Sequence, residues 1–107
     1  MNDDAWLRIK QPAGDQEWYR GRSSVIKWDV LDPSITTLKI SVSCQHWYEN
    51  GTSTVIGDNI PNTGQCKWER IPWGYPDMDD YFILIEAMDR DQAPIKSGLF
   101  SIKTYQP

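Results

Sequence analysis

Leu38-Lys39-Ile40-Ser41-Val42-Ser43-Cys44 is the stretch that decides the fold of this 107-residue chain. Apolar and polar residues alternate along it, with Leu, Ile, Val and Cys on one side and Lys and Ser on the other. Successive side chains of a β-strand point to opposite faces. The pattern therefore predicts a strand with one face in a core and the other in contact with water.

Shorter runs with β-prone residues lie on both sides of this stretch, separated by Gly, Pro, Asn and Asp. The strand is expected to continue through Trp47-Tyr48, where Asn50-Gly51 predicts a hairpin turn, and Gly57-Asp58-Asn59 predicts a short connection. No stretch of ten or more residues has an apolar stripe at helical spacing. The further strands are expected at Leu7–Ile9, Ser24–Val30, Ser53–Ile56, Cys66–Ile71, Tyr81–Ala87 and Leu99–Lys103.

About seven short strands with frequent turns predict an all-β fold, an antiparallel β-sandwich of immunoglobulin or fibronectin III character. The length fits one domain, expected over residues 1–107 with its core over about 7–103. The residues expected to fill the space between the two sheets are Ile26, Trp28, Trp68, Tyr81, Ile83 and Phe100.

The net charge of the chain limits the classes of partner that it can bind. Eleven basic and fifteen acidic residues give 11 − 15 = −4, which argues against nucleic acid as a general ligand. No apolar run of about 18 residues occurs, so no membrane span is expected. The first four residues lack both the basic and the apolar region of a secretory signal, which leaves a cytoplasmic and a processed, exported chain open.

Six Trp in a chain of this size are several times ordinary usage, and not all of them fit the predicted core. Rings near turns with polar neighbours could cover the ends of a small sandwich, anchor a protein partner or stack on sugar rings. The candidate binding aromatics are Trp18, Tyr19, Trp47, Tyr48, Trp73 and Tyr75.

Several short motifs follow one another in an order typical of one family. They are Val25-Ile26-Lys27-Trp28, Ile60-Pro61-Asn62-Thr63-Gly64-Gln65-Cys66-Lys67-Trp68, Asp80-Tyr81-Phe82-Ile83-Leu84-Ile85 and Ser97-Gly98-Leu99-Phe100-Ser101-Ile102. The chain resembles the immunoglobulin-like N-terminal domain of yeast cell-wall glucan-assembly proteins and of Ser/Thr-rich, GPI-anchored fungal surface proteins. The resemblance implies an extracellular or cell-surface, non-enzymatic module. It supplies no catalytic residue to carry over.

Two cysteines lie on inward-facing positions of predicted strands. Cys44 shares a face with Leu38, and Cys66 shares a face with Trp68. A disulfide between them would close a loop of about 20 residues and stabilise the fold by about 3 kcal/mol. We predict this disulfide, with two reduced core thiols as the alternative. A metal site is not expected, because His46 is the single histidine and completes no zinc ligand set.

Asn50-Gly51-Thr52 matches an N-glycosylation acceptor, so Asn50 is a candidate glycosylation site; the alternative is that Asn-Gly only forms the turn. No nucleophile motif or glycine-rich phosphate loop accompanies His46, so neither catalysis nor a cofactor is expected. The acidic residues near Asp77 and Asp89 flank one predicted strand, and each cluster offers fewer oxygens than calcium needs.

The sequence therefore predicts a non-catalytic extracellular or cell-surface module with a structural, adhesive or assembly role. A protein partner or a second copy is expected to bind through exposed aromatics or sheet edges. The alternative is a carbohydrate-binding module that recognises cell-wall polysaccharide through exposed aromatics.

Overall fold

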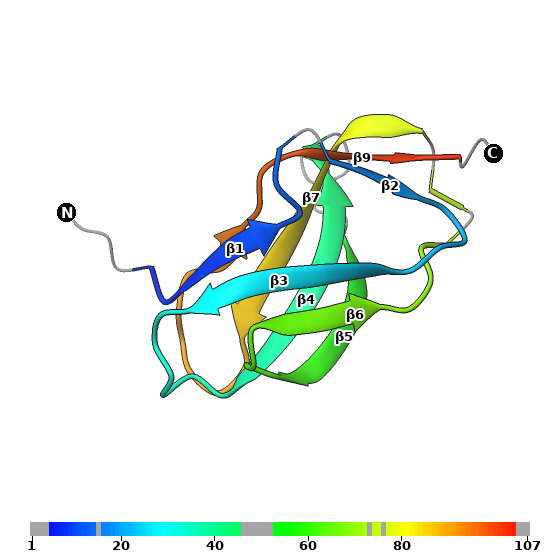
Figure 1. Cartoon of the computed structure of the whole chain (residues 1–107). Helices are drawn as coiled ribbons and strands as arrows, with labels where there is room; N and C mark the ends of the chain where they lie inside the picture. The colour runs from blue at the N-terminus through cyan, green and yellow to red at the C-terminus, as the bar shows by residue number, and fades with distance from the viewer. Residues whose placement is uncertain (1–4, 15, 46–52, 73, 76, 105–107) are drawn as a thin grey trace.

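Two facing β-sheets make up the computed structural model, which describes residues 5–14, 16–45, 53–72, 74–75 and 77–104 (Figure 1). The strands in these ranges are β1 (Leu7–Gln11), β2 (Glu17–Tyr19), β3 (Ser24–Val30), β4 (Thr37–Cys44), β5 (Thr54–Pro61), β6 (Gln65–Trp68), β7 (Met78–Ala87), β8 (Ile95–Lys96) and β9 (Phe100–Lys103). The predicted all-β, two-sheet architecture is confirmed.

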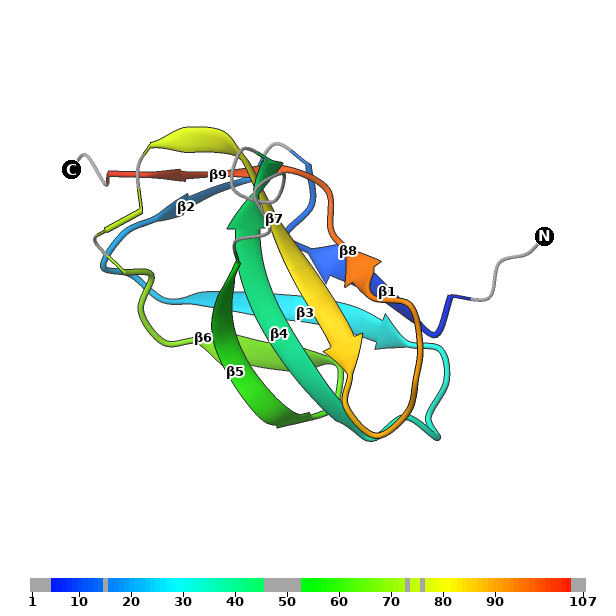
Figure 2. The ribbon, with the colours of Figure 1, turned by 180° about the vertical axis from the view of Figure 1, so that it is seen from behind.

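The smaller sheet has the order β1-β3-β6 and faces the viewer in Figure 1. The larger sheet has the order β2-β9-β7-β4-β5, with β8 also paired to β7, and it faces the viewer in Figure 2. All pairings are antiparallel except that of β2 with β9, which is parallel. Because β3 lies in one sheet and β4 in the other, the connection between them crosses from sheet to sheet.

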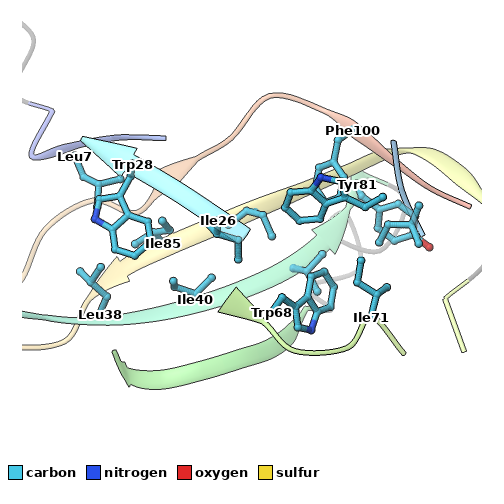
Figure 3. Packing of buried hydrophobic residues seen from close by; sticks show 14 of the residues in the cluster. Leu7, Ile26, Trp28, Leu38, Ile40, Trp68, Ile71, Tyr81, Ile85 and Phe100 are labelled. Carbon is cyan, nitrogen blue, oxygen red and sulfur yellow. The ribbon is translucent and has the colours of Figure 1, made fainter. Parts of the chain in front are cut away.

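The core lies between the sheets and follows the alternation seen in the sequence. Leu38, Ile40, Val42 and Cys44 of β4 are fully buried. Ile26 and Trp28 of β3 approach them from the opposite sheet, as the view in Figure 3 shows. All six residues expected in the core are buried, namely Ile26, Trp28, Trp68, Tyr81, Ile83 and Phe100.

The outer face of β4 is less exposed than its serines suggest. Ser41 and Ser43 are both buried, and Ser43 pairs across the ladder with Phe82 of β7, which is fully buried outside the core cluster. The Lys96 ammonium lies 4.3 Å from the centre of the Phe82 ring. The expectation that the polar side of this strand contacts water is therefore wrong at Ser41 and Ser43.

The Gly57-Asp58-Asn59 segment is not a connection but part of β5. The pairing register with β4 shifts twice here, and Asn59 adopts a positive φ of 53°. These irregularities are β-bulges, in which extra residues on one strand are accommodated without ending the ladder. The predicted strand over 53–56 consequently extends to Pro61, where Thr37 of β4 still pairs with it.

Candidate functional site

Five aromatic rings pack against one another at one end of the core. The ring centres of Trp18 and Phe100 are 4.8 Å apart, those of Trp68 and Tyr75 are 6.0 Å apart, and Tyr75 stacks on Tyr81 at 5.8 Å. Trp18 is only 6% exposed and Tyr75 only 8% exposed. Of the alternatives for Trp18 and Tyr75, the structure shows the packing one: both rings fill the end of the sandwich, so the prediction that they are exposed binding aromatics is wrong.

Tyr19 is half-buried, and its hydroxyl donates a hydrogen bond to Glu17 Oε1 at 3.1 Å. Trp47, Tyr48 and Trp73 lie outside the described residues, so their role as binding aromatics stays a prediction. The same holds for glycosylation at Asn50, which also lies outside the described residues.

Arg20 closes the aromatic end of the core from the side. Its side chain is buried, and Nη1 donates a hydrogen bond to the Tyr75 carbonyl oxygen at 2.7 Å. Nη2 contacts the Asp77 carboxylate and the Thr104 hydroxyl. The guanidinium therefore ties the segment after β2 to the segments before β7 and after β9, and its charge is compensated by one carboxylate.

The two buried phenols of this cluster are not suited to acid–base work. Burial raises the pKa of Tyr81 far above the usual range of tyrosine, and the neighbouring Cys44 and Tyr75 add to this effect. Burial also raises the pKa of Tyr75, against a smaller opposing effect of a hydrogen bond with Thr54. Both phenols consequently stay protonated at neutral pH.

A surface hollow of about 490 Å³ lies beside this end of the molecule, lined by Gly14, Glu17, Asp79, Leu99, Phe100, Ser101 and Lys103. Lys103 Nζ is 3.5 Å from Glu17 Oε2, and both side chains are close to half exposed. Water therefore reaches and screens this ion pair. Among the described residues that line the hollow, the charged ones are Glu17, Asp79 and Lys103, and none of them is buried.

The acidic residues near Asp77 and Asp89 lie at opposite ends of β7. Asp89 accepts hydrogen bonds from the Thr36 backbone N–H at 3.0 Å and the Thr36 hydroxyl at 2.9 Å, which lower the pKa of this carboxyl. Asp77 contacts Arg20 near the other end of β7. Within the described ranges, no three His, Cys, Asp or Glu side chains converge as a metal site would require.

The two cysteines are both free thiols, so the predicted Cys44–Cys66 disulfide is wrong. Cys44 pairs with Tyr81 inside the larger sheet, whereas Cys66 pairs with Ile26 inside the smaller sheet. Alternation correctly placed both residues on inward-facing positions, but it carries no information on where along the two sheets these positions meet.

The thiols are expected to differ in reactivity with a water-soluble disulfide reagent. Cys66 is partly exposed and should react in the native protein, though more slowly than a free cysteine because burial and the nearby Glu69 raise the pKa of its thiol. Cys44 is fully buried and should react only after unfolding. Thiol titration with and without denaturant tests this. A mass difference of two hydrogens on reduction would contradict it.

One group of candidate binding residues was not predicted from the sequence. Four cationic side chains lie on the outer face of the smaller sheet, which we call the basic face, made up of Arg8, Lys10, Lys27 and Lys67. The signal was present, since Lys27 stands between Ile26 and Trp28, and Lys67 between Cys66 and Trp68. It was missed because the balance of the whole chain, −4, hides a local excess of positive charge.

The structure resembles solved fibronectin(III)-like modules. One match is to a structure described as Clostridium thermocellum CbhA fibronectin(III)-like modules, with a TM-score of 0.51 and 14% sequence identity, over 94% of this chain and 99% of that chain. The chain thus has a fibronectin(III)-like fold. No protein family model matches the sequence. No curated protein matches it either.

Proposed function

We propose that this chain is a non-catalytic module with a structural, adhesive or assembly role at the cell surface or outside the cell. The observation that carries the proposal is the path of the chain. β1 begins and β9 ends at opposite ends of a molecule whose longest extent is 42 Å, as both ribbon views show (Figures 1 and 2).

This path suits a spacer. Chain ends of domains often lie close together, and such domains can be inserted into a loop of another protein. Here, groups joined to the two ends would be held apart by the length of the sandwich. β1 and β9 belong to different sheets that pack on one hydrophobic core, so the separation is set by a folded unit instead of a flexible linker.

Two further observations agree with a module that does no chemistry. The described rings of the aromatic cluster contribute to the core, and the hollow beside them holds a solvated ion pair. The fibronectin(III)-like fold agrees with this role but does not select it, because one fold carries many functions. The resemblance to fungal cell-wall modules supports the extracellular location, which stays part of the proposal.

Light scattering after size-exclusion chromatography tests the assembly role, with the protein loaded from micromolar to millimolar concentration. We expect the average mass to rise above the 12.4 kDa of one chain as concentration increases. A constant monomer mass over this range would contradict assembly through self-association.

A second measurement tests the non-catalytic assignment. The protein is incubated with glucan, chitin and mannan oligomers, and we expect no new reducing ends. Release of reducing ends would overturn the assignment. A shift of tryptophan fluorescence on adding a neutral oligomer would instead favour the carbohydrate-binding alternative through Trp47 or Trp73.

A further inference from the structure

The basic face is built by the pairing of three strands. Arg8 of β1 lies opposite Asp29 of β3, and Lys27 of β3 is the next outward residue on the same strand. Lys67 of β6 lies opposite Val25, one outward position further along. Diagonal neighbours on one face of a sheet are about 7–8 Å apart. The cations therefore cross the whole width of the smaller sheet, the sheet nearest the viewer in Figure 1.

Positive charge on this face exceeds the negative charge beside it. Among the described residues, the four cations pair with two acidic side chains, Asp29 and Glu69, which leaves 4 − 2 = +2. The rest of the chain then carries seven basic and thirteen acidic residues, or −6, so the total is again −4. In the part of the chain that the structure describes, the outer face of the smaller sheet thus carries a local positive charge, opposite in sign to the net charge of the chain.

The acidic neighbours leave much of this charge available. Asp29 is shared by Arg8 at 3.6 Å and Lys10 at 3.9 Å, and Glu69 lies 3.8 Å from Lys67. Lys27 is exposed and takes part in none of the ion pairs found in the described ranges. Exposed pairs at such distances are weak, and the remaining cations repel one another. An anion that spans the face would relieve this repulsion.

The composition of the face indicates which anion fits. The exposed large apolar residues of the described ranges are Leu31, Val55, Met88 and Leu99, and none belongs to β1, β3 or β6. Protein interfaces need buried apolar or aromatic anchors and are poor in lysine. Single-stranded nucleic acid needs exposed rings for its bases to stack on, and the outward positions of this face carry none. A lysine-rich face without exposed rings suits a chain that binds through spaced charges alone.

We propose that the basic face binds a linear acidic polysaccharide, whose carboxylate or sulfate groups contact Arg8, Lys10, Lys27 and Lys67 across the three strands. The proposal deepens the proposed function, because it names a polymer that the module would hold. Binding of this kind releases counterions and weakens steeply with salt.

Binding to polygalacturonic acid oligomers tests the proposal, followed by backbone NMR shifts at low salt. We expect shifts confined to β1, β3 and β6, and a loss of affinity of about tenfold or more between roughly 50 and 200 mM salt. The double variant Lys27→Gln/Lys67→Gln should lose about tenfold in affinity or more. Both residues are exposed, so circular dichroism should show an unchanged fold.

The matched control is Lys39→Gln/Lys103→Gln, which changes the net charge equally on the larger sheet. An equal loss in both variants would overturn the proposal, because net charge alone would then explain binding. So would no binding at low salt, equal binding of neutral mannan, or tighter binding of oligothymidylate of the same charge. These failures leave the mass measurement untouched, whereas cleavage of the polygalacturonic acid would overturn the non-catalytic function itself.

Discussion

Trp28→Ala is expected to lower the free energy of unfolding by about 3–5 kcal/mol, the range measured when large buried aromatics are truncated. The indole is only 3% exposed. In Figure 3 it lies between the sheets close to Leu7, Leu38 and Ile85. A loss of this size is a large part of the 5–15 kcal/mol by which domains are typically stable.

Trp28 also fixes the turn between β5 and β6. Its Nε1 donates a hydrogen bond to Asn62 Oδ1 at 2.7 Å, and Asn62 Nδ2 donates to the Ile35 carbonyl oxygen at 2.7 Å. The Trp28 backbone N–H donates to the Gly64 carbonyl oxygen at 2.9 Å, and Gly64 adopts a φ of 102°, which glycine tolerates best. The Trp28 indole thus contributes both to the packing of the core and to the conformation of the turn between β5 and β6.

Urea unfolding followed by circular dichroism measures both contributions. Trp28→Phe keeps much of the ring but removes the donor to Asn62, and we expect it to cost about 1–3 kcal/mol. Leu31→Ala, at an exposed residue just after β3, is the control and should stay within about 0.5 kcal/mol of the parent. A Trp28→Ala protein as stable as the Leu31→Ala protein would contradict the packing described for the core.

Arg20→Met is expected to cost about 2–3 kcal/mol. The variant keeps most of the apolar stem but takes one donor from the Tyr75 carbonyl oxygen and removes the contacts with Asp77 and Thr104. Charged hydrogen bonds contribute about 1.5–3 kcal/mol each, and truncating a fully buried ion pair costs about 3–5 kcal/mol. We expect a cost near the lower end of these free-energy ranges because the Asp77 side chain is exposed.

The control for this variant is Lys103→Met, which removes one ion pair between half-exposed side chains and should cost about 0–1 kcal/mol. Arg20→Lys should fall between the two, since an ammonium keeps the charge but cannot reproduce the planar fork of the guanidinium. Equal unfolding midpoints for Arg20→Met and Lys103→Met would show that the buried guanidinium adds no more than a surface cation does.

Strands with long alternating patterns could be predicted from the sequence, because alternation records which side chains a core will cover. Residues 24–30 form β3 with the expected bounds, and the predicted strand at 38–44 differs from β4 by one residue. β2 and β8 could not be predicted. β2 has three residues and is held by parallel pairing with β9, which lies more than 80 residues away in sequence, so no local pattern marks it.

The same limit explains the errors at the candidate site. The burial of Trp18 follows from its pairing opposite Ile102, and that of Tyr75 from its stacking on Tyr81. Both contacts join segments that the sequence presents as separate. Trp18 is buried by a pairing with a strand far away in sequence, whereas Tyr75 is buried because the loop before β7 folds its ring back onto Tyr81. The basic face, by contrast, follows from strand alternation and only needed the neighbouring strands β1, β3 and β6 to be identified.

The two bulges of β5 affect how readily this edge of the sheet can pair with a strand of another molecule. β5 is at the edge of the larger sheet, and an edge with free backbone groups can recruit a strand of another molecule and start aggregation. The register shifts around Gly57 and Asn59 twist and interrupt this edge, so an incoming strand finds no long, regular ladder to extend. At high protein concentration, this edge is therefore a poor template for strand addition by a second copy.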